Sequence, residues 1–319
     1  MAYFQNEMFV FQIKDFADKV NENIQKIGAR KLWKQGHTGK GIVIAVLDTG
    51  CATAHADLKD RIIGGYNFTG DHSGNPAIYE DLNGHGTHVA GIIAASGDNQ
   101  GMVGVAPDAQ LLILKVLNRR GVGTHDAVTA AIQYAAEWRG PNNEKVDIMS
   151  LSLGASTGDE KLHEAIKKSI EADITVVVAA GNEGDGNLDT DEFSYPAAYE
   201  EVVAVGGIDN WNNIAEFSNT NHFVDLYAPG VEIESTYLRD GYMSLSGTSM
   251  AAPHVTGAIA LLMNKYEGSL RERPAEAERY QYLMKHTDLL VVKENKTICV
   301  LNVGKEAGME KTEAKAVIQ

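Results

Sequence analysis

The chain has 319 residues, of which 44% are hydrophobic, enough to bury a core as one large domain or two small ones. Its formal net charge of -15 argues against nucleic acid as a partner, because a phosphate backbone is bound by clustered Lys and Arg. No apolar run approaches the length that spans a membrane, and the first residues lack the pattern of a signal peptide. The only two cysteines, Cys51 and Cys299, suit a reducing compartment, so we expect a cytoplasmic protein.

Apolar runs of strand length alternate with longer segments of helical period along the chain. This pattern is typical of parallel strands buried on both faces, and it predicts a doubly wound α/β fold with a mostly parallel sheet and helices on both faces. We expect strands at 42–47, 111–116, 146–151, 174–179 and 202–205. We expect helices at 85–95, 124–138, 159–172 and 249–266. The domain organisation we expect is an N-terminal extension over 1–25, a main domain over 26–300 and a polar tail over 301–319.

Three segments carry the residue types that acyl transfer needs. Asp48 ends the apolar run 42–47, where an ionised carboxylate requires a partner to offset its desolvation. His85 opens a predicted helix, and a histidine can take up and release a proton near neutrality. Ser249 stands at the mouth of another helix, between small residues that leave its hydroxyl accessible. A serine in this position can also be a plain helix cap, so only the three segments together indicate catalysis.

A fourth segment, 178–184, ends a predicted strand and carries Asn182. Its side-chain amide could donate to a developing oxyanion together with the backbone N–H of Ser249. Taken alone, Asn182 is better explained as a turn residue. In doubly wound sheets the ligand crevice lies at the carboxyl ends of the strands, and Asp48 and Asn182 both fall at that edge.

These four motifs, in this order and spacing between about Trp33 and Tyr266, closely resemble the subtilisin family (peptidase S8). The chain order Asp, His, Ser is the order of the subtilisin triad. The resemblance implies a serine endopeptidase with Asp48, His85, Ser249 and Asn182 as catalytic residues. Because only about forty residues precede the first long strand, the resemblance is greatest to intracellular subtilisins of bacteria.

Several alternatives remain open at this stage. The tripeptide Asp48-Thr49-Gly50 also occurs in pepsin-like proteases, which need two copies, whereas the chain has one. His85 and His88 are one helical turn apart and could form a metal pair, but the Glu of His-Glu-x-x-His is missing. We expect His88 to pack behind the site and Cys51 to be a small core residue. A secreted subtilisin without its leader and a peptide-binding pseudoenzyme are the rival interpretations of the whole chain.

The resemblance also implies a substrate groove between two exposed backbone strips. A peptide would add as an extra strand between them, which gives affinity with little sequence selectivity. We expect polypeptide substrates with a broad preference for apolar or large residues before the cleaved bond. The expected substrate-binding residues are Gly121, Val122, Gly123, Ser152, Leu153, Gly154, Ala179, Ala180 and Gly181.

Two segments are candidate sites for structural Ca²⁺, which takes about six to eight oxygen ligands. The first resembles the family's strong site and would use Asp57, Ser96, Asp98, Gln100 and Met102, with Asp18 from the N-terminal segment. The second has alternating oxygen-bearing residues, although a solvated acidic turn explains it as well. Its members are Asp185, Asn187, Asp189, Asp191 and Glu192.

The apolar segment 8–13 is unusual at a chain terminus. Intracellular subtilisins lay such an extension across their own cleft, usually with a proline, but here the first proline is Pro76. We therefore expect either a plug of the groove, as in a zymogen, or an apolar edge strand packed on the domain. The polar tail 306–315 is either mobile or a dimer contact, and the family resemblance suggests a homodimer.

Overall fold

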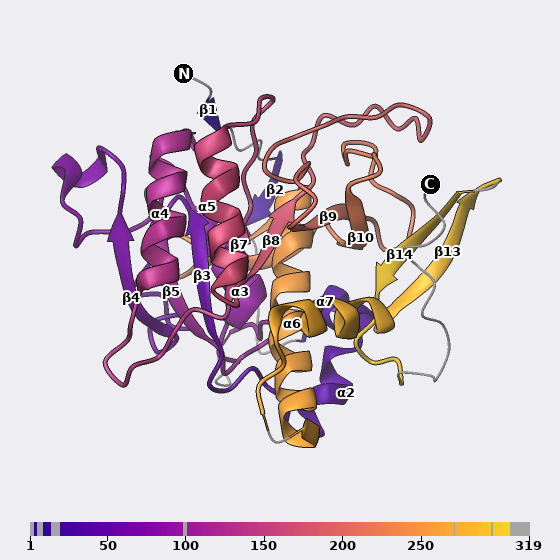
Figure 1. The fold of residues 1–319 in the computed structure, drawn as a ribbon, viewed down its shortest axis with the longest axis horizontal. Helices are drawn as coiled ribbons and strands as arrows, with labels where there is room; N and C mark the ends of the chain where they lie inside the picture. Colours follow the sequence, from indigo (N-terminus) through magenta and orange to yellow (C-terminus); the bar gives the residue numbers. More distant parts are fainter. Residues whose placement is uncertain are drawn as a thin grey trace.

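A nine-stranded sheet forms the centre of the computed structural model, which describes residues 3–4, 9–13, 20–97, 101–270, 272–294 and 296–306 (Figure 1). The strand order is β13-β14-β10-β9-β8-β7-β3-β5-β4, and every pair is parallel except β13 with β14. The strands are β3 (Val43–Asp48), β4 (Ile62–Asn67), β5 (Gln110–Lys115), β7 (Ile148–Leu151), β8 (Thr175–Ala179), β9 (Val203–Ile208), β10 (Val224–Pro229), β13 (Thr287–Lys293) and β14 (Lys296–Leu301).

Helices cover both faces of this sheet, as the doubly wound prediction requires. Alternate residues of β3 enter different cores: Ile44 and Val46 pack in the core that includes residues of the helices α3 (His85–Ala94) and α6 (Thr248–Leu270). Ala45 and Leu47 pack in the core that includes residues of α4 (His125–Glu137) and α5 (Glu160–Glu171). A strand buried on both sides has no room for polar alternation, which explains the continuous apolar run.

Smaller elements complete the domain. The helices α1 (Glu22–Lys26), α2 (Ala29–Trp33) and α7 (Glu276–Lys285) and the 3-10 turn η1 (Asp71–Gly74) lie outside the central sheet. A three-stranded antiparallel sheet joins β11 (Ile233–Tyr237), β12 (Gly241–Ser246) and β2 (Phe9–Ile13). A short antiparallel pair joins β1 (Tyr3–Phe4) to β6 (Gly123–Thr124).

All five predicted strands and all four predicted helices are present, with ends shifted by a few residues. The packed domain extends beyond the boundaries expected at 25/26 and 300/301. Ile24 and Val303 are both fully buried in the same core, and the backbone N–H of Val303 donates to the carbonyl of Ile27. In the part of the chain that the structure describes, no helix has the length and apolar character needed to cross a membrane.

Candidate active site

Asp48 and His85 form the buried centre of the site. Asp48 is the last residue of β3 and His85 the first of α3, and each side chain is 1% exposed. His85 Nδ1 lies 2.8 Å from Asp48 Oδ1 and 2.9 Å from Oδ2. The backbone N–H of Thr49 also donates to Oδ1, which holds the carboxylate in place. A carboxylate on Nδ1 fixes the tautomer in which Nε2 is free to accept a proton, and Nε2 has no partner within the described residues.

Asp81, which the sequence analysis missed, positions the start of α3. Its buried carboxylate accepts the N–H groups of Asn83 and Gly84 on one oxygen, and the N–H and hydroxyl of Thr87 on the other. These bonds satisfy donors at a helix terminus, where the first amides have no helical partner. The sequence did contain a signal for this cap: an Asp stands two residues before Asn-Gly-His, close to the predicted helix start.

Ser249 lies in the first turn of α6, with its side chain 6% exposed. Its hydroxyl is 3.4 Å from the carbonyl oxygen of Ser152, at the end of β7. Pro253 has no N–H for the helical bond to the carbonyl of Ser249, and the hydroxyl of Ser152 donates to that carbonyl instead, at 2.9 Å. Ser152 therefore contacts both the backbone and the hydroxyl of Ser249.

Asn182 is held by Thr248, the residue before Ser249. Its carbonyl oxygen Oδ1 accepts the backbone N–H of Thr248 at 2.8 Å and the Thr248 hydroxyl at 2.9 Å. With the oxygen occupied in this way, the amide nitrogen Nδ2 is the atom left to serve a ligand. The backbone N–H of Ser249 is also without a helical partner at this position of the helix, so two donors stand near one another.

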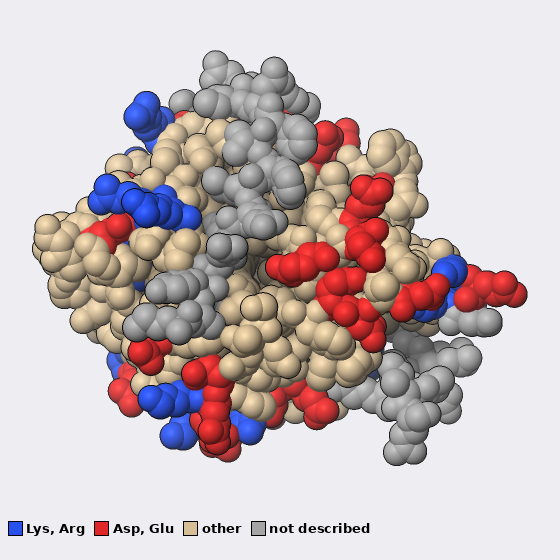
Figure 2. Space-filling view, turned by 90° about the horizontal axis from the view of Figure 1, so that it is seen from above, with Lys and Arg blue, Asp and Glu red and all other residues tan. Residues whose placement is uncertain are grey.

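A cavity of about 160 Å³ opens beside Ser249 and Asn182. Four of the residues expected in the substrate pocket line it: Leu153, Gly154, Ala179 and Gly181. Ser152 and Ala180 are not among the lining residues; both are buried, Ser152 against Ser249. The lining residues that the sequence analysis missed are Ala155, Ser156, Glu183, Ser194 and Thr248. Figure 2 shows the face of the molecule that lies at the top of Figure 1. Acidic side chains gather along one half of this face.

Comparison with known proteins matches residues 39–311 to the model of the subtilase family, peptidase S8. The chain belongs to the subtilase family. It is 49% identical to the "Intracellular serine protease" of Paenibacillus polymyxa, over 87% of this chain and 84% of that protein. It is 48% identical to the "Major intracellular serine protease" of Bacillus subtilis, over 90% and 87%. Identity to "Subtilisin DY" of Bacillus licheniformis is 42%, over 78% and 86%. The protein is therefore a subtilase of the intracellular type and a serine endopeptidase.

Two residues near the subtilase site have the packing roles expected of them. His88 is fully buried, and its Nε2 donates to the carbonyls of Ile233 and Met243 at 3.0 Å, so the ring packs behind the site. Burial lowers the pKa of His88 to about 3, which keeps the ring neutral. Cys51 is a buried core residue, and burial, followed by nearby carboxylates, raises the pKa of its thiol well above the usual value.

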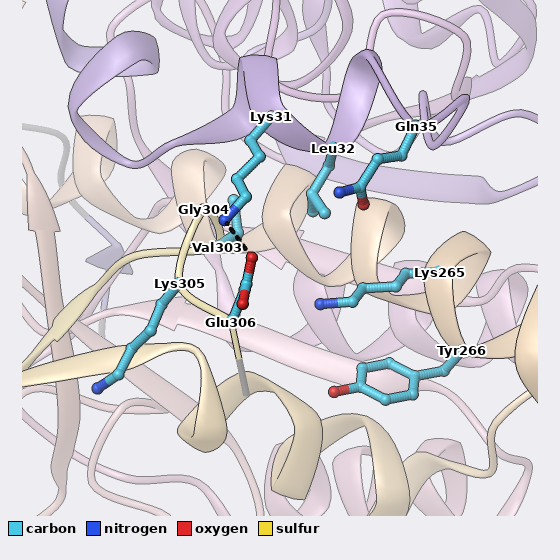
Figure 3. A pocket seen from close by; sticks show the side chains of 9 residues that line it. All are labelled: Lys31, Leu32, Gln35, Lys265, Tyr266, Val303, Gly304, Lys305 and Glu306. Atoms are coloured by element: carbon cyan, nitrogen blue, oxygen red, sulfur yellow. Dashed lines mark hydrogen bonds and ion pairs between the residues drawn. The ribbon is translucent and has the colours of Figure 1, made fainter. Parts of the chain in front are cut away.

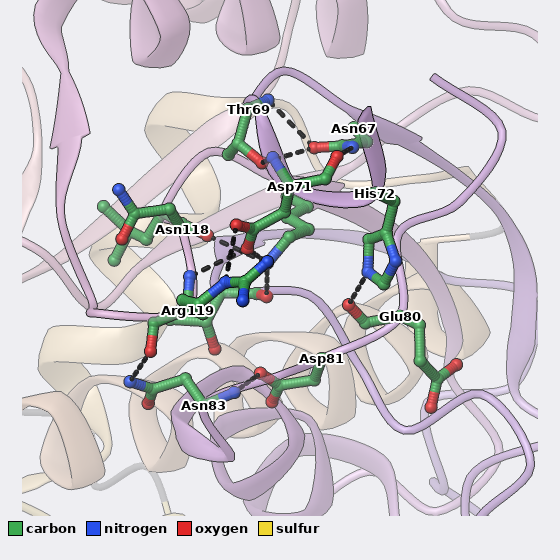
Figure 4. Close-up of polar contacts among 12 residues, drawn as sticks. Asn67, Thr69, Asp71, His72, Glu80, Asp81, Asn83, Asn118 and Arg119 are labelled. Carbon is green, nitrogen blue, oxygen red and sulfur yellow. Dashed lines mark hydrogen bonds and ion pairs between the residues drawn. The ribbon is translucent and has the colours of Figure 1, made fainter. Parts of the chain in front are cut away.

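A buried ion pair, also missed from the sequence, supports the loop after Asp48. Lys115 is 0% exposed, and its Nζ lies 3.1 Å from Asp71 Oδ2 and donates to the carbonyl oxygen of Thr49. Asp71 also accepts the backbone N–H and the Nε of Arg119. Figure 4 shows Asp71 and Arg119 within a wider network of polar contacts that includes Asn67.

The candidate calcium residues are only partly described. Asp57 is 1% exposed; its Oδ2 accepts the N–H of Met102 and the hydroxyl of Tyr242, whereas Oδ1 is buried and has no hydrogen-bond partner among the described residues. The N–H of Ser96 donates to the carbonyl of Asp57. Asp18, Asp98 and Gln100 lie outside the described residues. No cluster of three or more metal-ligating side chains occurs among the residues that are described.

The residues of the second candidate loop have protein partners. Asp189 forms ion pairs with Lys293 and Lys296 of the β13–β14 hairpin. The carboxylate of Asp185 accepts the N–H of Asn187, as in a turn, and the carboxylate of Glu192 accepts that of Thr220. These contacts are those expected of an acidic turn, and calcium binding by this loop stays a prediction.

The N-terminal segment pairs with the domain at two places. Tyr3 and Phe4 pair with Thr124 and Gly123, so β1 lies along the strip expected to bind substrate. Of the two alternatives expected for 8–13, the structure shows the edge strand: Phe9–Ile13 pairs with β12, the strand leading toward Ser249. Met8 lies outside the described residues. Gly121 and Val122 precede β6 in the turn after Asn118, whose carbonyl accepts the N–H of Gly121.

Proposed function

We propose that this subtilase cleaves peptide bonds with Ser249 as nucleophile, His85 as general base and then general acid, and Asp48 as the carboxylate that orients and stabilises the imidazole. The contact between His85 Nδ1 and Asp48, with Nε2 left unpartnered, is the observation that carries the proposal. The Ser249 hydroxyl turns from Ser152 toward Nε2, which takes its proton as Oγ attacks the substrate carbonyl. Nε2 then delivers that proton to the leaving amine. A water molecule, deprotonated by Nε2 in the same way, next attacks the acyl-enzyme, and Ser249 leaves with the proton returned to its Oγ.

The negative charge that develops on the carbonyl oxygen needs donors already in place. We propose Asn182 Nδ2 and the backbone N–H of Ser249 for this role, because Thr248 fixes the orientation of the Asn182 amide. The side chain before the cleaved bond would enter the 160 Å³ cavity. Its walls are built mainly from small residues, which leaves room for a large side chain. Leu153, Ala155 and Ala179 form the apolar part of the lining, and the rest is largely polar, with Glu183 as its charged member.

Structural calcium at the first candidate site is part of the proposal. A buried carboxylate oxygen without a donor is costly unless a cation satisfies it, and Asp57 Oδ1 has no donor in the part of the chain that the structure describes. Asp57 would be the charged ligand, joined by oxygens of Ser96, Met102 and the neighbouring segment. The ion would hold the loop near Ser96 against the domain and take no part in the chemistry.

We further propose that the N-terminal segment restrains the enzyme through β1. A chain already paired with Gly123 and Thr124 occupies backbone groups that a substrate strand would use. The names of the two intracellular relatives support action in the cytoplasm. A homodimer is also proposed; Leu289 and Val291, 71% and 77% exposed on the outer strand β13, are a suitable apolar contact.

A serine-directed sulfonyl fluoride tests the central assignment. The full chain is treated with the inhibitor, digested and analysed by mass spectrometry to locate the adduct. We expect a single modification on Ser249, with loss of peptidase activity in proportion to labelling. An adduct on another residue, or activity that survives in Ser249→Ala, would overturn the mechanism.

A further inference from the structure

A second cavity, of about 340 Å³, lies toward the far end of α6 from the active site. Helix α2, helix α6 and the loop that follows β14 form its walls (Figure 3). Lys265 on α6 is sixteen residues beyond Ser249, which at 1.5 Å per residue corresponds to about 24 Å along the helix. An occupant of this cavity would therefore not touch a peptide bound at Ser249.

Two lysines direct their ammonium groups into this cavity from different elements. Lys31 reaches in from α2 and lies 3.3 Å from Glu306 Oε1, whereas Lys265 reaches in from α6 (Figure 3). Lys265 Nζ donates to His286 Nε2 at 2.9 Å, and it makes no ion pair with a carboxylate among the described residues. Lys305 also lines the cavity, but it points away and pairs with Asp288.

The positive charge in the cavity is incompletely neutralised. Burial and then the charge of Lys31 lower the pKa of Lys265, opposed by Glu306. Burial and then Lys265 lower the pKa of His37, and burial lowers that of His286 to about 4, with a contribution from Lys265. The charge of Lys265 therefore keeps the neighbouring histidines neutral and has no carboxylate partner among the described residues, which is unusual in a chain with a net charge of -15.

We propose that this cavity binds a small dianionic oxyanion between Lys31 and Lys265. Two ammonium groups match two negative charges, and Gln35 and Tyr266 on the cavity wall supply neutral donors. Glu306 acts as a weak internal substitute, because its side chain is 91% exposed and can leave without breaking a packed contact. The bound anion would link α2, α6 and the C-terminal loop, so binding stabilises the fold without changing the peptidase site.

Calorimetric titration of the full chain carrying Ser249→Ala tests this site without autolysis. The probes are sodium sulfate and sodium succinate, each at constant ionic strength set with sodium chloride. We expect saturable binding to one site, and a thermal midpoint about 2 °C higher at ten times the dissociation constant. The tighter of the two probes tells a tetrahedral oxyanion from a dicarboxylate as the natural class.

Three variants assign the binding to this cavity. Lys265→Met should weaken binding about tenfold or more, Lys31→Met should weaken it several-fold, and the exposed Lys145→Met is the matched control that should not change it. Glu306→Gln should tighten binding several-fold, because the internal competitor is removed; a merely structural role of Glu306 would not produce this sign. If Lys265→Met does not fold, Lys31→Met and Glu306→Gln decide. No saturable heat with either anion, or unchanged affinity in the lysine and Glu306 variants, overturns the proposal.

Discussion

Lys115 and Asp71 form an ion pair, with 3.1 Å between Nζ and Oδ2, in which the lysine is 0% exposed and the aspartate 7%. Burial alone would raise the pKa of Asp71. The hydrogen bonds and charges of Lys115 and Arg119 outweigh burial, so the pKa is lower than usual and the carboxyl stays ionised. The same ammonium donates to the carbonyl of Thr49, the residue after Asp48. The pair thus connects the loop around Asp71 to the loop that follows Asp48.

Lys115→Met should destabilise the protein by about 3 kcal/mol, because the buried carboxylate of Asp71 then keeps only Arg119 as a charged partner. The loss of the donor to Thr49 should also lower kcat several-fold while KM changes little. Denaturant unfolding and steady-state kinetics measure the two effects. The double variant Lys115→Met/Asp71→Asn should recover much of the stability but not kcat. Full recovery of kcat would contradict a positioning role for Lys115.

Asn182→Ala should lower kcat about 10²–10³-fold with little change in KM, which is the magnitude known for the equivalent donor in subtilisin. Thr248→Val removes one of the two bonds that hold the Asn182 oxygen, about 1 kcal/mol, so kcat should fall roughly fivefold. Thr157→Ala, at an exposed position that does not line the cavity, is the control and should leave kcat unchanged. Equal kinetics for Thr248→Val and wild type would show that the backbone bond alone orients the amide.

The pH dependence of stability should reflect three buried neutral histidines. Burial lowers the pKa of His88 to about 3 and the pKa values of His254 and His286 to about 4, whereas a histidine titrates near 6.5 when unfolded. Between these values the unfolded chain binds more protons than the folded one, so stability falls as pH decreases below about 6.5. Each histidine contributes a slope of about 1 kcal/mol per pH unit.

Urea unfolding of Ser249→Ala at pH 7, 6 and 5 measures this slope. His254→Gln should remove one histidine's share of it, although the variant also loses the bonds of His254 to Met250 and Asn23 and starts from lower stability. His222→Gln, at an exposed position, should keep the full slope. An identical dependence of stability on pH in all three proteins would mean that groups other than His254 cause the loss of stability at low pH.

Sequence patterns revealed the strands that are buried on both sides and the residues at their ends. The run before Asp48 is continuous and apolar because both faces of β3 are covered. By contrast, β4 contains Gly64 and Gly65 and is only partly buried, so no run marks it. The edge strand β13 alternates between half-buried and exposed residues, but its exposed positions include Leu289 and Val291, so no polar alternation marks it and it was also missed.

The supporting residues of the site were harder to find for a different reason. Thr248 contacts Asn182 across 66 positions of sequence, and Lys115 contacts Thr49 across 66 as well. No local pattern reports such a contact, because it exists only after the elements have packed. Lys115 ends an apolar strand, where a lysine is normally solvated, yet here it is fully buried.

Removal of calcium should lower the thermal midpoint by about 5 °C or more, because an ion bound only to the folded state stabilises it by mass action. Differential scanning calorimetry of Ser249→Ala, with and without a chelator, measures the effect. In Asp57→Asn the chelator should have little effect, since the charged ligand is gone. Asp185→Asn is the matched control and should respond like the parent protein. An equal response in Asp57→Asn would place the ion elsewhere.

The two N-terminal pairings can be separated by truncation. Deleting 1–8 removes β1 but keeps β2, so the strip at Gly123 becomes free for substrate. We expect kcat/KM on a peptide substrate to rise at least tenfold, mainly through KM, with an unchanged thermal midpoint. Deleting 1–20 should give a similar rate, but a lower thermal midpoint, because β12 loses its neighbour.

A point variant tests β1 without shortening the chain. Phe4→Pro removes a backbone donor from the short pair with Gly123, so it should activate the enzyme partway toward the 1–8 deletion. Gln5→Ala is the control, with the backbone N–H retained. If the 1–8 deletion and Phe4→Pro both hydrolyse peptide at the rate of the full chain, β1 does not compete with substrate. The N-terminal segment would then serve only as an edge strand on β12, which a lower thermal midpoint of the 1–20 deletion alone would reveal.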